Sequence, residues 1–133
     1  MVGIKGDSAT TADRASRLRQ ALAHLRAELT LLDKVFLARE PIMPGSVYEL
    51  HTKCGKPSCR CAGGAELHSC MVISWTARGR KRLRSISKDK LTELVALTQR
   101  YQRFRKARAR FVEVHAKMLT IIDELEAARR KEP

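Results

Sequence analysis

Residues 54–70 read CGKPSCRCAGGAELHSC, a loop sequence around which the other elements of the chain are arranged. The stretch holds all four cysteines of the protein and one of its four histidines. Gly55, Pro57, Gly63 and Gly64 disfavour a helix or a strand here, so we expect a loop. Zinc binds four soft donors in a tetrahedron, and a flexible loop with five such donors can converge on one ion. We therefore predict a structural zinc knuckle.

Cys54, Cys59 and Cys61 are the firmest candidates for metal ligands, and His68 and Cys70 compete for the fourth position. Four protein ligands leave no position for water, which favours a structural zinc ion over a catalytic one. Three other interpretations stay open. The cysteines can be four reduced thiols, they can form two disulfides in an oxidising compartment, or they can hold an iron–sulfur cluster.

Length and composition limit the remainder of the fold. The 133 residues suit one small domain, and an aromatic content of 5% argues against a large globular core. Residues 1–7 lack the apolar core of an export signal, and no apolar run approaches the length of a membrane span. The predicted compartment is therefore the cytoplasm, including the nucleoid, where thiols stay reduced and metal is favoured over disulfides.

Residues 1–9 are expected to form a flexible tail, followed by a first coiled-coil helix over residues 10–40. Thr10 and Asp13 have the spacing of a capping box at the start of this helix. Pro41 disfavours helical backbone in the residue before it and so marks the end of the helix. Between these limits the apolar residues recur at alternating steps of three and four, the pattern of a coiled coil. They are Ala15, Leu18, Leu22, Leu25, Leu29, Leu32 and Phe36.

Residues 41–86 are predicted to form a zinc-knuckle and β-hairpin unit. Met71–Thr76 and Arg80–Ile86 have the composition of two strands, joined by a turn that ends at Gly79. Ser46–His51 alternates weakly and is a candidate for a short strand that leads into the cysteine loop. A two-stranded hairpin alone is marginal in water, and zinc at its base would supply the missing stability. One face of the return strand carries Arg80, Arg82 and Arg84.

Residues 87–131 are predicted to form a long second helix, with Ser87 as its N-cap. The expected fold class is therefore mainly α: an antiparallel helical (coiled-coil) hairpin with a small β-hairpin and zinc-knuckle unit between the two long helices. The second helix is longer than the first, and the apolar surface of its extra length predicts a homodimer through the long helices. Its apolar residues recur at steps of three or four, at Leu94, Leu97, Tyr101, Phe104, Ala107, Phe111, Val114, Met118, Ile121 and Leu125.

Positive charge is concentrated in one quarter of the chain. The formal net charge is +13, and residues 78–110 carry a net charge of +11. A field of this density attracts polyanions, and contacts of Lys and Arg with phosphates release counterions. The few aromatic residues disfavour a stacking platform for single strands, so duplex DNA is the preferred partner, with structured RNA left open. The expected contacts are Arg80, Arg82, Arg84, Arg103, Lys106 and Arg110.

The order of the motifs along the chain resembles that of an uncharacterised family of short bacterial proteins, a domain of unknown function. It runs from Pro44-Gly45-Ser46-Val47-Tyr48 through Cys54-Gly55-Lys56-Pro57-Ser58-Cys59-Arg60-Cys61 and His68 to a hairpin and a long basic helix. The resemblance covers residues 44 to about 106, without the first helix, and its specific part is the Cys-Gly-Lys-Pro-x-Cys-x-Cys run. It implies a bacterial, intracellular protein carried near mobile genetic elements, and it implies no activity. In the family pattern Gly-Pro and an aromatic residue follow the histidine. Here Ser69 and Cys70 follow it, which makes His68 the better fourth ligand.

The leading hypothesis is a non-enzymatic nucleic-acid-binding protein with an accessory or regulatory role, built on a structural zinc site. The alternative is a protein–protein adaptor that uses coiled-coil and zinc-knuckle surfaces. An enzyme would need a nucleophile and a base, for which Cys54 or Cys61 with His51 or His68 are the candidates. Nothing in the sequence supplies an oxyanion site or a third orienting group. We therefore predict no catalytic residue, no small-molecule substrate and no membrane partner.

Overall fold

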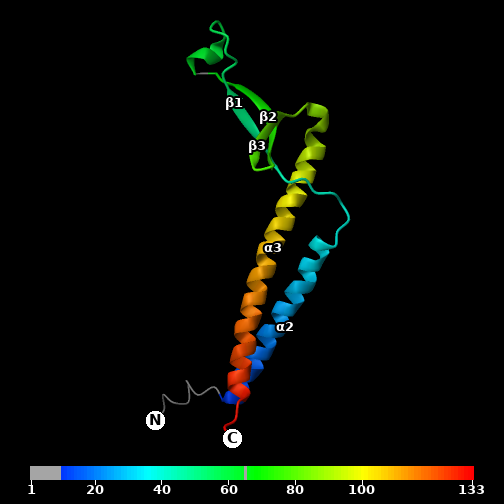
Figure 1. Cartoon of the computed structure of the whole chain (residues 1–133), viewed down its shortest axis with the longest axis vertical. Coiled ribbons are helices and arrows are strands. Elements are labelled where there is room, and N and C mark those ends of the chain that lie inside the picture. Colours follow the sequence, from blue (N-terminus) through cyan, green and yellow to red (C-terminus); the bar gives the residue numbers. More distant parts are fainter. Residues whose placement is uncertain (1–9, 65) are drawn as a thin grey trace. The chain divides into compact units, whose positions relative to one another are not determined.

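The computed structural model describes residues 10–64 and 66–133 (Figure 1). The flexible tail predicted for residues 1–9 lies outside the described residues. The described residues divide into two compact units: a helical unit, up to Ala38 together with Arg105–Pro133, and a sheet unit, Arg39–Phe104. The elements follow the order α2 (Thr11–Phe36), β1 (Ser46–Thr52), the 3-10 helix η1 (Arg60–Gly63), β2 (His68–Ala77), β3 (Arg80–Ser85) and α3 (Lys88–Arg129).

The predicted fold class, a mainly α helical hairpin with a small β-hairpin unit between two long helices, is wrong. The described chain contains two helices and a three-stranded antiparallel sheet in the order β1-β2-β3. All seven residues of β1 pair with β2, from Ser46 opposite Ser74 to Thr52 opposite His68. The sequence signal of β1 is weak because apolar residues do not alternate along it. Its pairing with the central strand, a contact distant in sequence, holds it in the sheet.

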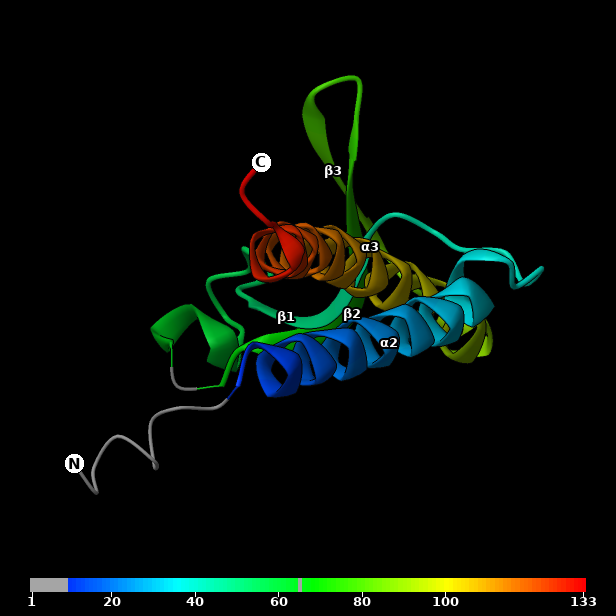
Figure 2. The ribbon, with the colours of Figure 1, turned by 90° about the horizontal axis from the view of Figure 1, so that it is seen from below.

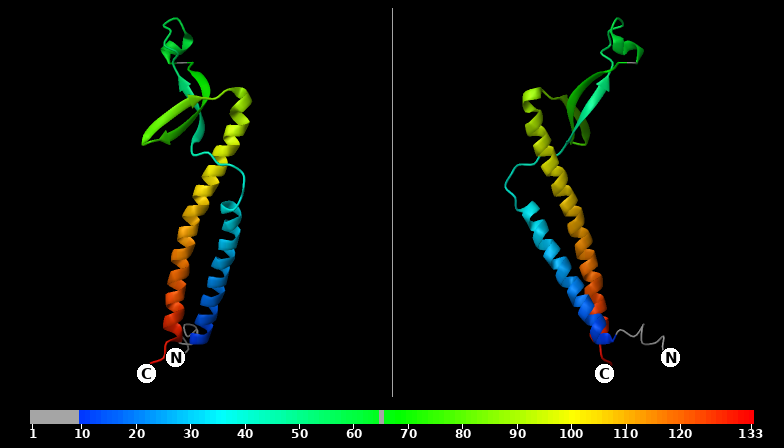
Figure 3. Two further views of the ribbon diagram at one scale, coloured as in Figure 1. Left: turned by 45° about the vertical axis from the view of Figure 1, so that its right-hand side comes forward. Right: turned by 180° about the vertical axis from the view of Figure 1, so that it is seen from behind.

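In the helical unit, α2 lies beside the C-terminal part of α3 and runs antiparallel to it (Figure 3). The helix begins after Thr10, whose hydroxyl accepts a hydrogen bond of 3.0 Å from the backbone N–H of Asp13, as the capping pattern indicated. It ends at Phe36. All seven apolar positions of the predicted stripe are buried or half-buried. On the α3 side, Ala107 is buried and Val114 is fully enclosed, at 0% exposure.

Two contacts hold α2 against α3 within the helical unit. The Arg110 guanidinium donates hydrogen bonds to both carboxylate oxygens of Glu28, the one from Nη2 with a length of 2.8 Å. The rings of Phe36 and Phe111 pack edge to face, with their centroids 5.6 Å apart. Aromatic pairs favour this arrangement because the positive edge of one ring meets the negative face of the other. The two contacts fix the register of the helices at points 82 and 75 residues apart in sequence.

The sheet unit has its core in the middle of β2. Val72 and Ile73 are adjacent, so their side chains point to opposite faces of the sheet, and they are 1% and 5% exposed. Both faces are therefore covered at this point. The edge strand β3 differs sharply, since all six of its residues are exposed.

Backbone contacts connect the sheet and its flanking segments to the first half of α3. The N–H of Ile86 donates to the carbonyl oxygen of Met71 at 2.8 Å, immediately before α3 begins. The N–H of Met43 donates to the carbonyl oxygen of Leu97 at 3.1 Å, where the buried Thr98 hydroxyl already bonds to an earlier turn of the helix. No helix among the described residues is long and apolar enough to cross a membrane.

The close approach of β1 to β2 makes a prediction about Gly45. A Cβ atom on Gly45 would lie 2.9 Å from the carbonyl oxygen of Ser74, which is a backbone atom and cannot rotate away. We expect Gly45→Ala to lower the free energy of unfolding by about 1–3 kcal/mol, measured by urea denaturation. Gly63→Ala is the matched control, because no atom lies within 4 Å of its Cβ position. Equal stability of the two variants would contradict this packing.

The Glu28–Arg110 pair makes a prediction about pH. The hydrogen bonds from Arg110 lower the pKa of Glu28 below its ordinary value of 4.5. The pair therefore stabilises the fold fully above the unfolded-state pKa, and this contribution is lost as pH falls through the folded-state pKa. We expect Glu28→Gln to lower the Tm at pH 7 and to have a smaller effect at pH 3. The control, Glu126→Gln, removes an exposed pair between the last turn of α3 and Arg130, the residue after the helix, and should change the Tm little at either pH. Equal losses for Glu28→Gln at the two pH values would contradict the assignment.

Candidate metal centre and basic surface

Local backbone geometry shapes the cysteine loop between β1 and β2. Cys59 has extended backbone and precedes η1, the single turn formed by Arg60–Gly63. The N–H groups of Ala62 and Gly64 donate to the carbonyl oxygens of Cys59 and Cys61, each at 3.0 Å. Gly64 ends the turn in the left-handed conformation. The turn thereby directs Cys61 inward, where it is completely buried.

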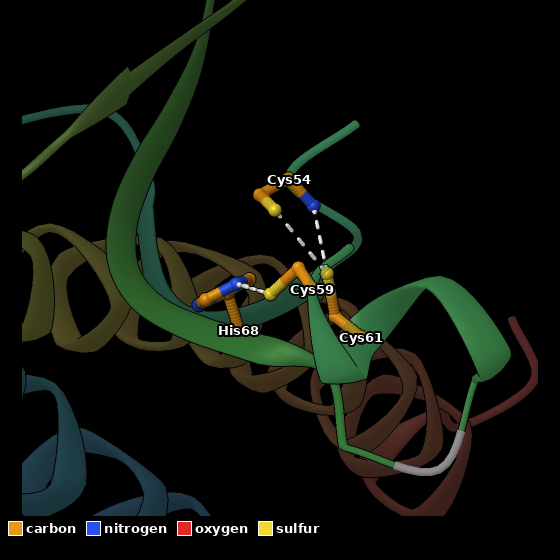
Figure 4. A group of neighbouring side chains, drawn as sticks. All are labelled: Cys54, Cys59, Cys61 and His68. Carbon is orange, nitrogen blue, oxygen red and sulfur yellow. Dashed lines mark hydrogen bonds between the residues drawn. The ribbon is translucent and has the colours of Figure 1, made fainter. Parts of the chain in front are cut away.

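Four of the predicted ligands meet in this loop (Figure 4). One donor atom from each of Cys54, Cys59, Cys61 and His68 lies within 4.8 Å of all the others. Cys61 Sγ lies 3.4 Å from Cys54 Sγ, and Cys59 Sγ lies 3.1 Å from His68 Nε2. Bonds of about 2.0–2.3 Å to one tetrahedral ion require donors about 3.3–3.8 Å apart. The donor atoms are therefore close enough together that the group could hold a metal ion.

The fifth candidate, Cys70, is not part of this group. Cys70 lies on β2 opposite Leu50, and its side chain is exposed. His68 and Cys70 point to the same side of β2, but a strand rises about 3.3 Å per residue, so Cys70 lies about 6.6 Å farther along. All four cysteines are free thiols. His51, a candidate base in the enzyme hypothesis, lies 3.8 Å from the Glu49 carboxylate and outside the group.

Hydrogen bonds and burial shift the pKa values of two thiols of the group, Cys59 and Cys61, in opposite directions. The backbone amide of Cys61, followed by the His68 imidazole and the neighbouring thiols, lowers the pKa of Cys59 to about 6. A thiol with this pKa is mostly thiolate at neutral pH, and the thiolate is the form that binds metal. The backbone N–H of Cys54 lowers the pKa of Cys61, but burial and the adjacent thiols outweigh this bond, so the net change is an increase.

The predicted nucleic-acid contacts fall into two groups. Arg80, Arg82 and Arg84 are exposed on β3, and Arg103 and Lys106 are exposed on α3. The ion pairs between described residues involve none of these five. The sixth, Arg110, is half-buried and is bound to both Glu28 and Glu113. Its hydrogen bonds with these carboxylates raise its pKa, and they place it in the packing of α2 on α3.

One further contact on the basic strand was missed from the sequence. The guanidinium carbon of Arg84 lies 5.9 Å from the ring centroid of Trp75, within the range of a cation–π interaction. Trp75 pairs with Arg82 across the hairpin and is half-buried. The sequence contained a signal for this proximity, because a turn at residues 78–79 places Trp75 opposite Arg82 and therefore near the arginines of β3.

The fold and the site define a small protein with a three-stranded sheet and a Cys3His group that could hold a metal ion. The model of the domain of unknown function DUF6788 matches residues 12–96, and the chain therefore belongs to this family. This confirms the resemblance drawn from the motifs, and the match also includes α2, which was expected to lie outside it. No curated protein and no solved structure matches the chain.

The donor group makes a prediction about metal content. We expect the purified chain to bind one metal ion per molecule, measured by elemental analysis and by the absorption spectrum of the cobalt(II) form. Cys59→Ser removes one donor and should lower the affinity for the ion by at least tenfold, because a thiolate is lost from the coordination sphere. Cys70→Ser is the matched control and should retain both the stoichiometry and the spectrum. Loss of the ion in Cys70→Ser, or its full retention in Cys59→Ser, would contradict the assignment.

Proposed function

We propose that the chain is a non-enzymatic, cytoplasmic protein that binds nucleic acid, with duplex DNA preferred, in an accessory or regulatory role. The observation that supports the proposal is the exposed strand β3, whose arginines have no carboxylate partner among the described ion pairs. A cationic surface without internal counterions attracts polyanions. An accessory role beside the enzymes of mobile elements is part of the same proposal.

Contacts with the nucleic acid would come from two elements. On β3, Arg80, Arg82 and Arg84 alternate with residues of the opposite face, so that their guanidinium groups share one side of the strand. On α3, Arg103 and Lys106 are three positions apart and therefore lie on neighbouring points of one helix face. Arg110 continues this row, but its guanidinium is occupied by two carboxylates, so we assign it to the stability of the helical unit.

Zinc is the ion that best suits the donor set of three thiolates and one imidazole. Zinc prefers four-coordinate sites of sulfur and nitrogen ligands, and a site with four protein ligands is structural, since it keeps no position for a substrate or water. His68 is the first residue of β2, and Cys54 follows the end of β1 by two residues. A bound zinc ion would therefore close the end of the sheet at which these two strands are joined.

A protein–protein adaptor is the second candidate, and exposed apolar side chains in the helical unit favour it. Val112, Leu119 and Ile122 of α3 are 57%, 60% and 46% exposed. Steps of seven and three place them on one side of the helix. In an adaptor this face would contact the partner protein, whereas in the predicted homodimer it would contact a second copy of the chain.

Binding measured over a range of salt concentrations tests the proposal. We expect fluorescence anisotropy to show tighter binding to labelled duplex DNA than to single-stranded DNA or RNA. Log K should fall with log salt with a slope of about −0.9 for each phosphate neutralised, and so no steeper than about −4 to −5 for these five residues. The absence of binding to any nucleic acid at ~50 mM salt, where such contacts are strongest, would overturn the proposal. A single stoichiometric protein partner under those conditions would support the adaptor.

A further inference from the structure

The hairpin of β2 and β3 continues beyond the third strand of the sheet. β1 pairs with β2 only as far as Ser46 opposite Ser74. Beyond that point, Trp75, Thr76 and Ala77 pair with Arg82, Lys81 and Arg80, and with no other strand. The end of the hairpin is thus a two-stranded ribbon, visible as the projecting loop of β3 in Figure 2.

The tip of this ribbon is a tight turn whose backbone conformation suits a twisted two-stranded hairpin. Arg78 and Gly79 form a two-residue connection in which both residues have positive φ, at 53° and 75°. Positive φ at both central positions is typical of the type I′ turn, which matches the twist of the two strands. Asn or Asp is preferred at the first of these positions. In this chain the first position is occupied by Arg78, which adds a cation at the tip although positive φ is unfavourable for arginine.

The two faces of the ribbon differ in chemistry. Directly paired residues share a face, so Trp75, Arg80, Arg82 and Arg84 lie on one side, which we call the arginine face. Lys81 and Leu83 lie on the other side. The contact of Arg84 with Trp75 spans a diagonal of the arginine face and holds that guanidinium over the indole ring. Trp75 is therefore a positioning residue for Arg84.

We propose that this ribbon enters the major groove of duplex DNA with its arginine face toward the base edges. The inference rests on the proposed nucleic-acid function and specifies the groove and the face. The major groove of B-form DNA is about 12 Å wide and admits a two-stranded ribbon, whereas the major groove of A-form RNA is deep and narrow. Arginine donates two hydrogen bonds to O6 and N7 of guanine, acceptors that lie in the major groove.

Two adjacent residues provide a matched test of the face. Arg82→Gln and Lys81→Gln each remove one positive charge from the same exposed strand, on opposite faces. We expect Arg82→Gln to weaken binding of the 133-residue chain to a guanine-rich duplex about tenfold more than Lys81→Gln does. Replacement of guanine by 7-deazaguanine removes N7 from the major groove and leaves the phosphates unchanged. It should weaken binding of the wild type severalfold and have little effect on Arg82→Gln.

A third readout follows from composition, because Trp75 is the single tryptophan of the chain. Its fluorescence should change as duplex DNA saturates the protein. If the wild type binds no nucleic acid in low salt, the proposed function is wrong. Binding to RNA but not to duplex DNA would overturn the ribbon inference and the preference for DNA. If the wild type binds duplex DNA but the two variants lose affinity equally, the 7-deazaguanine duplex binds normally, or Trp75 fluorescence stays constant at saturation, the ribbon inference is overturned and the proposed function stands.

Discussion

Antiparallel pairing of β1 with β2 is the constraint on which the sheet unit depends, and it requires closure of the cysteine loop. The last pair, Thr52 opposite His68, brings together the two ends of residues 53–67, a loop with three glycines. Closure of such a loop is entropically unfavourable, so it needs compensating contacts. Three thiols and an imidazole converge at this point. A metal ion bound by them would join the two strands at the end where the loop leaves the sheet.

The consequences of this closure continue along the chain. β2 is the central strand, so its position determines both the buried pair Val72 and Ile73 and the register of β3. The hydrogen bond from Ile86 to Met71 then fixes the point at which α3 leaves the sheet. The basic ribbon is therefore built on the strand that begins with His68, a member of the donor group. A structural ion bound by the donor group would therefore support the basic ribbon, although the ion itself would take no part in binding nucleic acid.

Local patterns in the sequence predicted local features well and failed where distant residues meet. The steps of three and four selected the positions of α2 that became buried or half-buried, and the spacing from Thr10 to Asp13 identified the helix cap. Ser46–His51 carries only a weak strand signal, because its place in the sheet is decided by β2 and not by its own alternation. The mainly α fold class was wrong for that reason. Counting charges likewise could not distinguish Arg110, whose partner Glu28 lies 82 residues away, from the arginines of β3.

A metal ion bound by the donor group would hold β1 and β2 together and so support the ribbon of β2 and β3. Amide hydrogen exchange with and without a metal chelator tests this role of the ion, because exchange is measured separately for each element. Removal of the ion should reduce protection in β1 and in the part of β2 nearest His68, while α2 and the C-terminal part of α3 keep theirs. Identical exchange of the sheet amides with and without the ion would contradict this role.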